Sequence, residues 1–127
     1  MPHLSIRIDF EPSGSALGPG MTQLLERVDE MGSIRQAAAS MDMSYRKAWL
    51  LIQEIQKTFD GAVVSAEAGG LAGGGTKLTE LGINLVKLYR RVENRATDAA
   101  RADLDTLAAL VRANAAPRRA GRRKKKS

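Results

Sequence analysis

The stretch Gly32–Lys57, GSIRQAAASMDMSYRKAWLLIQEIQK, has the pattern of two helices joined by a short turn. Gly32 is suited to ending a preceding helix in a left-handed conformation. Ser33 and Gln36 have the spacing of a capping box, in which the two residues satisfy each other's backbone amides at a helix start. Ser44 is of the residue type favoured as an N-cap for the second helix. The stretch therefore predicts a helix-turn-helix.

The second helix of this pair is expected from about Tyr45 to Phe59, with two different faces. At 100° per residue, one arc collects side chains that suit a core apart from the glutamine: Tyr45, Ala48, Trp49, Ile52, Ile55, Gln56 and Phe59. The opposite arc is mostly polar: Arg46, Lys47, Leu50, Gln53, Glu54 and Lys57. We therefore expect Trp49 in the core rather than on a surface where bases stack.

The basic first turn of this helix, Arg46-Lys47, lies where a recognition helix contacts base edges and phosphates. A solvated helix face could carry the same charges, but the capped, alanine-rich helix before it favours DNA. Leu50, an apolar residue on the polar face, is either a contact to a thymine methyl group or a surface leucine.

A glycine-dense segment, Gly69–Gly75, separates a strand that begins at Val63-Val64 from a return strand at Thr76–Leu78. Two interpretations are open, a flexible linker and the tip of a hairpin that follows a backbone closely, because glycine has no side chain to obstruct it. The strand-like edges favour the hairpin. The order Gly-Lys-Ser/Thr of a nucleotide-binding loop is absent, so the segment does not predict nucleotide chemistry.

The N-terminal third is expected to contain one strand and one helix. Apolar and polar residues alternate through Leu4–Phe10, which predicts a half-buried strand. Pro12–Gly20 is rich in proline and glycine and is expected to be a loop. Thr22–Met31 is expected to be a short helix with Leu24, Leu25, Val28 and Met31 on one face.

From Thr79 to about Asn114 the pattern is helical, and a helix of that length would be about 52 Å long. Ala96–Ala102 is weakly apolar and is a candidate place for a break. The excess length favours a second subunit over a helix that folds back on its own domain. The expected dimer contacts are Leu85, Leu88, Val92, Ala96, Leu104, Leu107 and Val111.

The net charge of +6 comes from the C-terminus. The tail Arg118–Ser127 holds seven of the 20 basic residues and no acidic one, which leaves 13 basic and 14 acidic residues elsewhere. Any DNA affinity of the folded part must therefore come from local placement of charge. The tail has the composition of a disordered segment, and it either contacts phosphates or is a solvated end.

Composition excludes several other classes. The chain has no cysteine, its one histidine, His3, is near the terminus, and no apolar run is long enough to span a membrane. No secretory signal is evident, so we expect a cytoplasmic protein. No catalytic triad, metal-ligand cluster or nucleotide loop is present, so we expect neither an enzyme nor a cofactor.

Several motifs together resemble the N-terminal DNA-binding domain of ModE-type molybdate-responsive regulators, and more loosely the helix-turn-helix of LysR-type regulators. The motifs are Leu17-Gly18-Pro19-Gly20, Gly32-Ser33-Ile34, Gln36-Ala37-Ala38, Met43-Ser44-Tyr45-Arg46-Lys47-Ala48-Trp49, the glycine segment, and Leu78-Thr79 with Gly82. The resemblance covers roughly residues 4–92. Beyond Val92 there is no room for molybdate-binding domains, so we expect no direct molybdate sensing.

The resemblance implies a winged-helix dimer. Together with the helical and charge patterns it predicts a mainly α fold with a small β-sheet, a winged helix-turn-helix in residues 1–92, a dimerisation helix in residues 79–114 and a disordered basic tail in residues 115–127. It implies a homodimer that binds double-stranded DNA and represses or activates molybdenum-related genes. Because the chain leaves no room for the molybdate-binding domains, we expect either that another protein supplies the signal or that the regulation is constitutive. The expected DNA contacts are Arg35, Gln36, Ser44, Tyr45, Arg46, Lys47, Leu50, Gln53, Lys57, Gly69, Gly70, Gly73, Gly74, Gly75 and Lys77.

Two alternatives to a sequence-specific regulator remain open. One is an architectural, nucleoid-associated DNA-binding protein that depends on the basic tail. The other is an adaptor whose winged helix binds protein. Deletion of the tail separates the first alternative from a regulator, and a lack of nucleic-acid affinity at low salt would favour the second.

Overall fold

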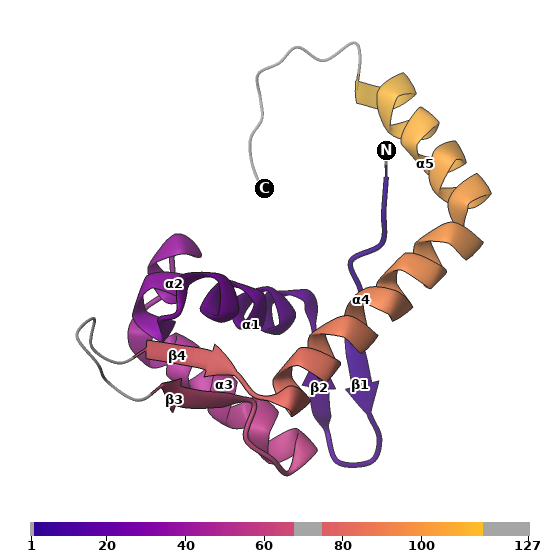
Figure 1. The fold of residues 1–127 in the computed structure, drawn as a ribbon. Helices are drawn as coiled ribbons and strands as arrows, with labels where there is room; N and C mark the ends of the chain where they lie inside the picture. The colour runs from indigo at the N-terminus through magenta and orange to yellow at the C-terminus, as the bar shows by residue number, and fades with distance from the viewer. Residues whose placement is uncertain (1, 68–74, 116–127) are drawn as a thin grey trace. The chain divides into compact units, whose positions relative to one another are not determined.

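A computed structural model describes residues 2–67 and 75–115 of the chain, and these residues form five helices and two small sheets (Figure 1). The helices are α1 (Pro19–Met31), α2 (Ile34–Ser40), α3 (Tyr45–Phe59), α4 (Glu80–Ala99) and α5 (Arg101–Ala115), and the strands are β1 (Ile8–Phe10), β2 (Ser15–Leu17), β3 (Val64–Glu67) and β4 (Gly75–Leu78). The sequence correctly predicted a mainly helical class, but it predicted one small sheet where the structure has two. The chain divides into a unit of residues 5–92 and a second unit of residues 1–4 and 93–127.

The core of the 5–92 unit lies between its helices and the β3–β4 hairpin. Its buried apolar side chains come from α1, α2, α3, the hairpin and the first half of α4: Leu24, Leu25, Val28, Ala37, Ala38, Ala48, Ile52, Ile55, Val63, Leu78 and Leu85. The small side chains of Ala37, Ala38 and Ala48 allow α1, α2 and α3 to pack closely. This core fixes which face of α3 points outward.

The N-terminal hairpin corrects the prediction of a loop from Pro12 to Gly20. β2 lies inside that range and pairs antiparallel with β1, with Ile8 opposite Leu17. Pairing between distant residues outweighs local composition here, and burial of Ala16 and Leu17 supports the strand. Helix α1 also begins earlier than predicted, at Pro19, where proline is favoured because that position needs no amide donor.

The predicted serine N-caps and the glycine end of α1 are confirmed, and of the capping box the structure shows the bond from the Gln36 amide to the Ser33 hydroxyl. Gly32 has φ of 69° and ends α1 in the left-handed region. The Ser33 hydroxyl oxygen accepts a hydrogen bond of 3.0 Å from the Gln36 amide at the start of α2. The Ser44 hydroxyl oxygen accepts one of 3.0 Å from the Lys47 amide at the start of α3. These local bonds determine where α2 and α3 begin.

The β3–β4 hairpin is attached to the start of the helix pair. Its register places Val64 opposite Leu78 and Glu67 opposite Gly75. The Thr76 amide donates a hydrogen bond of 2.9 Å to the Gly32 carbonyl oxygen. A Cβ atom on Gly75 would lie 3.0 Å from the same carbonyl oxygen, so this approach favours glycine.

The predicted helix from Thr79 to Asn114 is divided into α4 and α5 at Ala100, inside the weakly apolar segment named as a candidate break. Helix α4 starts beside β3: the Thr79 hydroxyl donates to the Ala62 carbonyl oxygen at 2.7 Å and accepts from the Gly82 amide at 3.1 Å. A Cβ atom on Gly82 would lie 2.3 Å from the Val63 carbonyl oxygen, which explains a glycine at this position.

In the second unit, the N-terminal segment is hydrogen-bonded to the helices of that unit. The Leu4 amide donates to the Thr97 hydroxyl oxygen at 3.1 Å, and Arg101 donates to the Pro2 carbonyl oxygen at 3.4 Å. Among the helices of residues 2–67 and 75–115, none is both long and apolar enough to cross a membrane. Residues 116–127 of the predicted basic tail lie outside the described residues, and Ala115 belongs to α5.

Candidate nucleic-acid interface

The outer face of α3 carries more positive than negative charge. Its exposed side chains include Arg46, Lys47, Gln53 and Lys57, and the one carboxylate in the helix is Glu54. Arg46 and Lys47 lie in the first turn, as predicted. The structure therefore brings these predicted site residues together on one accessible helix, although the 117 residues before the basic tail carry nearly equal numbers of basic and acidic residues.

The prediction that Trp49 belongs to the core is wrong. Trp49 is 44% exposed, and its neighbours Tyr45 and Leu50 are 42% and 46% exposed. The buried arc of α3 is set by Ala48, Ile52 and Ile55, and at 100° per residue Trp49 falls on the flank of that arc. The helical projection placed Trp49 at the edge of the predicted core arc, and the sequence did not reveal that the buried part of this arc is narrower than the apolar one.

Arg35 connects α2 to the first turn of α3. Its guanidinium carbon lies 4.5 Å from the centroid of the Tyr45 ring, a cation–π geometry. Ser44, immediately before Tyr45, is exposed, and its hydroxyl caps α3. Gln36 is exposed on α2. Ser44, Tyr45 and the Arg35 side chain therefore lie at the start of α3, whereas Gln36 lies in the first turn of α2.

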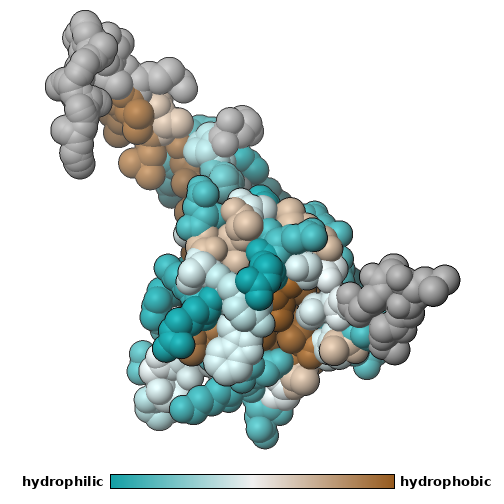
Figure 2. Space-filling view, turned by 90° about the vertical axis from the view of Figure 1, so that its left-hand side faces the viewer, coloured by the Kyte–Doolittle hydropathy of each residue, from teal (hydrophilic) through white to brown (hydrophobic). Residues whose placement is uncertain are grey.

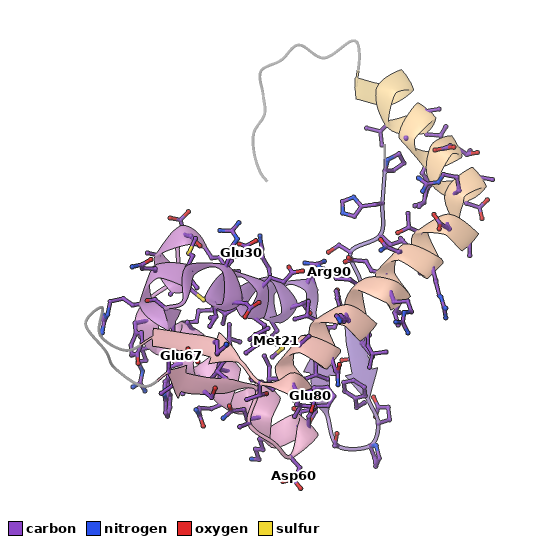
Figure 3. All side chains as sticks on the ribbon, viewed as in Figure 1. Met21, Glu30, Asp60, Glu67, Glu80 and Arg90 are labelled. Atoms are coloured by element: carbon purple, nitrogen blue, oxygen red, sulfur yellow. The ribbon has the colours of Figure 1, made fainter. Side chains whose placement is uncertain are left out.

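The hairpin contributes two described members of the predicted site, Gly75 and Lys77. The Lys77 ammonium lies 3.8 Å from a carboxylate oxygen of Glu67, on the paired strand, and both side chains are exposed. Figure 3 shows Glu67 at the end of β3 within the hairpin. An exposed pair of this kind contributes about 0–1 kcal/mol, so Lys77 remains available to another anion. The predicted contacts Gly69, Gly70, Gly73 and Gly74 lie outside the described residues.

The residues expected to form a dimer lie in different environments. Leu85 is 8% exposed and packs in the core of the 5–92 unit, so it is not available to a partner, and its place in the predicted set needs correction. The same unit exposes Leu88 and Val92. In the second unit, Leu107 and Val111 are 57% and 65% exposed, while Ala96 and Leu104 are partly buried. Figure 2 shows hydrophobic surface over α5.

One ion pair of the 5–92 unit links two of its helices. Two nitrogens of Arg90 on α4 donate to the two carboxylate oxygens of Glu26 on α1, at 3.0 and 2.7 Å. This bidentate pair joins the two helices. Across residues 2–67 and 75–115, no three histidine or carboxylate side chains are grouped so that they could hold a metal ion.

The sequence matches no protein-family model, but it is similar to several characterised proteins. It is 39% identical over 80 residues to the molybdenum transport protein ModE of Azotobacter vinelandii, which covers 63% of this chain and 30% of that protein. It is 37% identical over 71 residues to the DNA-binding transcriptional dual regulator ModE of Escherichia coli K12, covering 56% and 27%. The chain is homologous to the N-terminal part of the ModE regulators.

The molybdenum-pterin-binding protein MopB of Rhodobacter capsulatus is also related, at 36% identity over 84 residues, which cover 66% of this chain and 31% of MopB. The ModE-like segment therefore corresponds to about 30% of the length of these relatives. The named relatives are regulators or transport and binding proteins rather than enzymes. The arrangement of α2, α3 and the β3–β4 hairpin is consistent with a winged helix-turn-helix.

Proposed function

We propose that residues 5–92 are a winged helix-turn-helix that binds double-stranded DNA as part of a ModE-like transcription regulator. The observation that carries the proposal is the outer face of α3, where Arg46 and Lys47 follow a serine cap and the opposite face is anchored by Ile52 and Ile55. A helix held in this way can enter a major groove with its first turns directed at base edges. Homology to a DNA-binding ModE regulator supports the same function.

In this proposal α3 is the recognition helix and the β3–β4 hairpin is the wing. The 2.9 Å bond between Thr76 and Gly32 ties the base of the wing to the start of the helix pair. The described base of the wing then has a defined position relative to α3, so the Lys77 side chain would contact the DNA backbone beside the groove. The phosphate contacts position the protein, while the contacts from α3 select the sequence.

We also propose that the chain acts as a homodimer through α4 and α5. Each unit exposes an apolar pair with i, i+4 spacing, Leu88 with Val92 on α4 and Leu107 with Val111 on α5. Side chains four residues apart lie on one side of a helix, and burial against a second copy would remove them from water. Two copies would present two recognition helices to two half-sites.

The double variant Arg46→Ala with Lys47→Ala tests the assignment of α3. Gel-shift titration on a duplex selected from random DNA should show a loss of at least about tenfold, since each lost base contact costs about 1–3 kcal/mol. The matched control is Lys87→Ala with Arg91→Ala, which removes the same charge from exposed positions on α4. If both double variants bind as the parent does, the recognition helix is wrongly assigned.

The names of the relatives suggest molybdenum-related target genes and a cytoplasmic regulator, and we extend both to this chain as part of the proposal. We propose that the segment itself does not bind molybdate and that another domain or protein supplies the signal. Selection from random DNA with and without molybdate tests this directly. An isolated chain whose selected sequences change with molybdate would contradict it.

One observation favours a second candidate function, architectural binding of DNA. Seven of the ten residues from Arg118 to Ser127 are basic, enough for a salt-dependent, sequence-independent contribution. Deletion of these ten residues separates the two functions. A specific regulator should keep its preference for the selected duplex over a scrambled one, whereas an architectural binder should lose most of its affinity and of its salt dependence.

A further inference from the structure

Trp49 and Leu50 are neighbouring large apolar side chains that are both exposed on α3. Neither belongs to the buried core or to the partly buried side chains packed against it. The core uses Ala48, Ile52 and Ile55 of the same helix. Tyr45, one turn before Trp49, is also exposed but is stacked under Arg35. Trp49 and Leu50 therefore point about 100° apart around the helix axis, on either side of Arg46, and are the exposed large apolar side chains of this surface.

We infer that Trp49 and Leu50 read thymine methyl groups in the major groove, and hence that Trp49 is a specificity-determining residue. This inference rests on the proposed DNA-binding function. The thymine C5 methyl is the apolar group that base pairs present in the major groove, so it is the natural partner for an apolar side chain there. The preferred half-site should then carry thymines opposite these two side chains.

Charge complementarity identifies DNA as the occupant of this surface. Arg46, Lys47 and Lys57 lie on the same helix, against a single carboxylate, Glu54. A protein partner for an apolar patch would need no such excess of cations, whereas a duplex supplies phosphates on both sides of the groove. Apolar base contacts flanked by phosphate contacts match this mixture of side chains.

The position of Trp49 and Leu50 along α3 favours contact with bases over contact with the DNA backbone. Trp49 and Leu50 are the fifth and sixth residues of α3, directly after the capped first turn. The N-terminal residues of a recognition helix are those that reach base edges. The Arg35 guanidinium over the Tyr45 ring lies one turn before Trp49, so a cationic group also borders the start of the helix.

The test exchanges single thymines for deoxyuridine, which lacks the methyl group, in a duplex selected from random DNA. The parent protein should lose about fourfold in affinity for each methyl that it contacts, as expected for the burial of one methyl-sized apolar group. Trp49→Ala and Leu50→Ala should each bind more weakly and become insensitive to one subset of these exchanges. The control Ile83→Ala removes an exposed apolar side chain from α4 and should keep the parental pattern.

Fluorescence supplies a second readout because Trp49 is the one tryptophan in the chain. Binding of the selected duplex to the parent protein should reduce quenching of its emission by acrylamide. If the duplex binds specifically but uridine has no effect, or if Trp49→Ala retains full sensitivity at every thymine, the inference is overturned and DNA binding stands. If the parent binds no duplex even at low salt, both the inference and the proposed function fail.

Discussion

Helices α3 and α5 each contain 15 residues and each expose large apolar side chains, but they do so in different surroundings. Helix α3 buries Ala48, Ile52 and Ile55, and its exposed face combines aromatic, aliphatic and cationic groups. Helix α5 has no buried side chain among residues 101–111, and its most exposed apolar residues are aliphatic. The first pattern suits a polar, charged partner with apolar spots, and the second suits another apolar helix.

The largest expected effect concerns the buried face of α3. Ile52→Ala removes a side chain that is 1% exposed and should lower the free energy of unfolding by about 2–5 kcal/mol, measured by urea denaturation. Leu50→Ala, on the exposed face of the same helix, should change it by less than about 0.5 kcal/mol. Equal losses in the two variants would contradict the separation of α3 into a core face and a binding face.

The next prediction tests the exposed face of α5. Leu107→Gln with Val111→Gln should raise the dimer dissociation constant by at least about tenfold in sedimentation velocity experiments, because burying each aliphatic side chain contributes about 1.5–3 kcal/mol. The control is Ala102→Gln with Ala109→Gln, two exposed positions on the other side of the helix. A parent protein that sediments as a monomer throughout would remove α5 as a dimer contact.

A smaller effect is expected at the cap of α3. Ser44→Ala removes the acceptor for the Lys47 amide and should destabilise the 5–92 unit by about 0.5–2 kcal/mol in urea. Ser44→Thr keeps a hydroxyl at this position and should retain most of that stability. No loss in the alanine variant would mean that tertiary packing alone determines where α3 starts.

The smallest expected effect is on salt dependence. Lys57→Ala should weaken binding about equally for all sequences and reduce the slope of log affinity against log salt by about 0.9, the contribution of one phosphate. Lys87→Ala, on α4, should leave the slope unchanged. A change in sequence preference in the Lys57 variant would instead place this lysine at a base.

The sequence predicted the elements that depend on neighbouring residues. The Ser33 and Ser44 caps and the left-handed Gly32 follow from bonds between residues three or four apart, so local sequence was sufficient. Strand β2 was missed because its stability depends on pairing with β1 and on burial of Leu17, neither of which local composition reveals. Composition alone suggested a loop.

For the candidate site, the sequence predicted the exposure of the charged side chains but not the environment of every apolar one. The charged residues of α3 were assigned correctly to its exposed face, because burying an unpaired charge is costly. The environments of Trp49 and Leu85 were predicted wrongly, because a hydrophobic residue type does not reveal whether the side chain is buried in its own unit or exposed. Trp49 lies beside the buried arc of α3 and remains exposed, whereas Leu85 packs in the core of its own unit.

Photocrosslinking from the two helices tests the central claim most directly. A benzoylphenylalanine at position 50 on α3, or at position 107 on α5, would be irradiated with the protein bound to its selected duplex. We predict that position 50 crosslinks to DNA and position 107 to a second copy of the chain. Crosslinks from position 50 to protein alone, with none to DNA, would contradict the assignment of α3 as the helix that reads DNA.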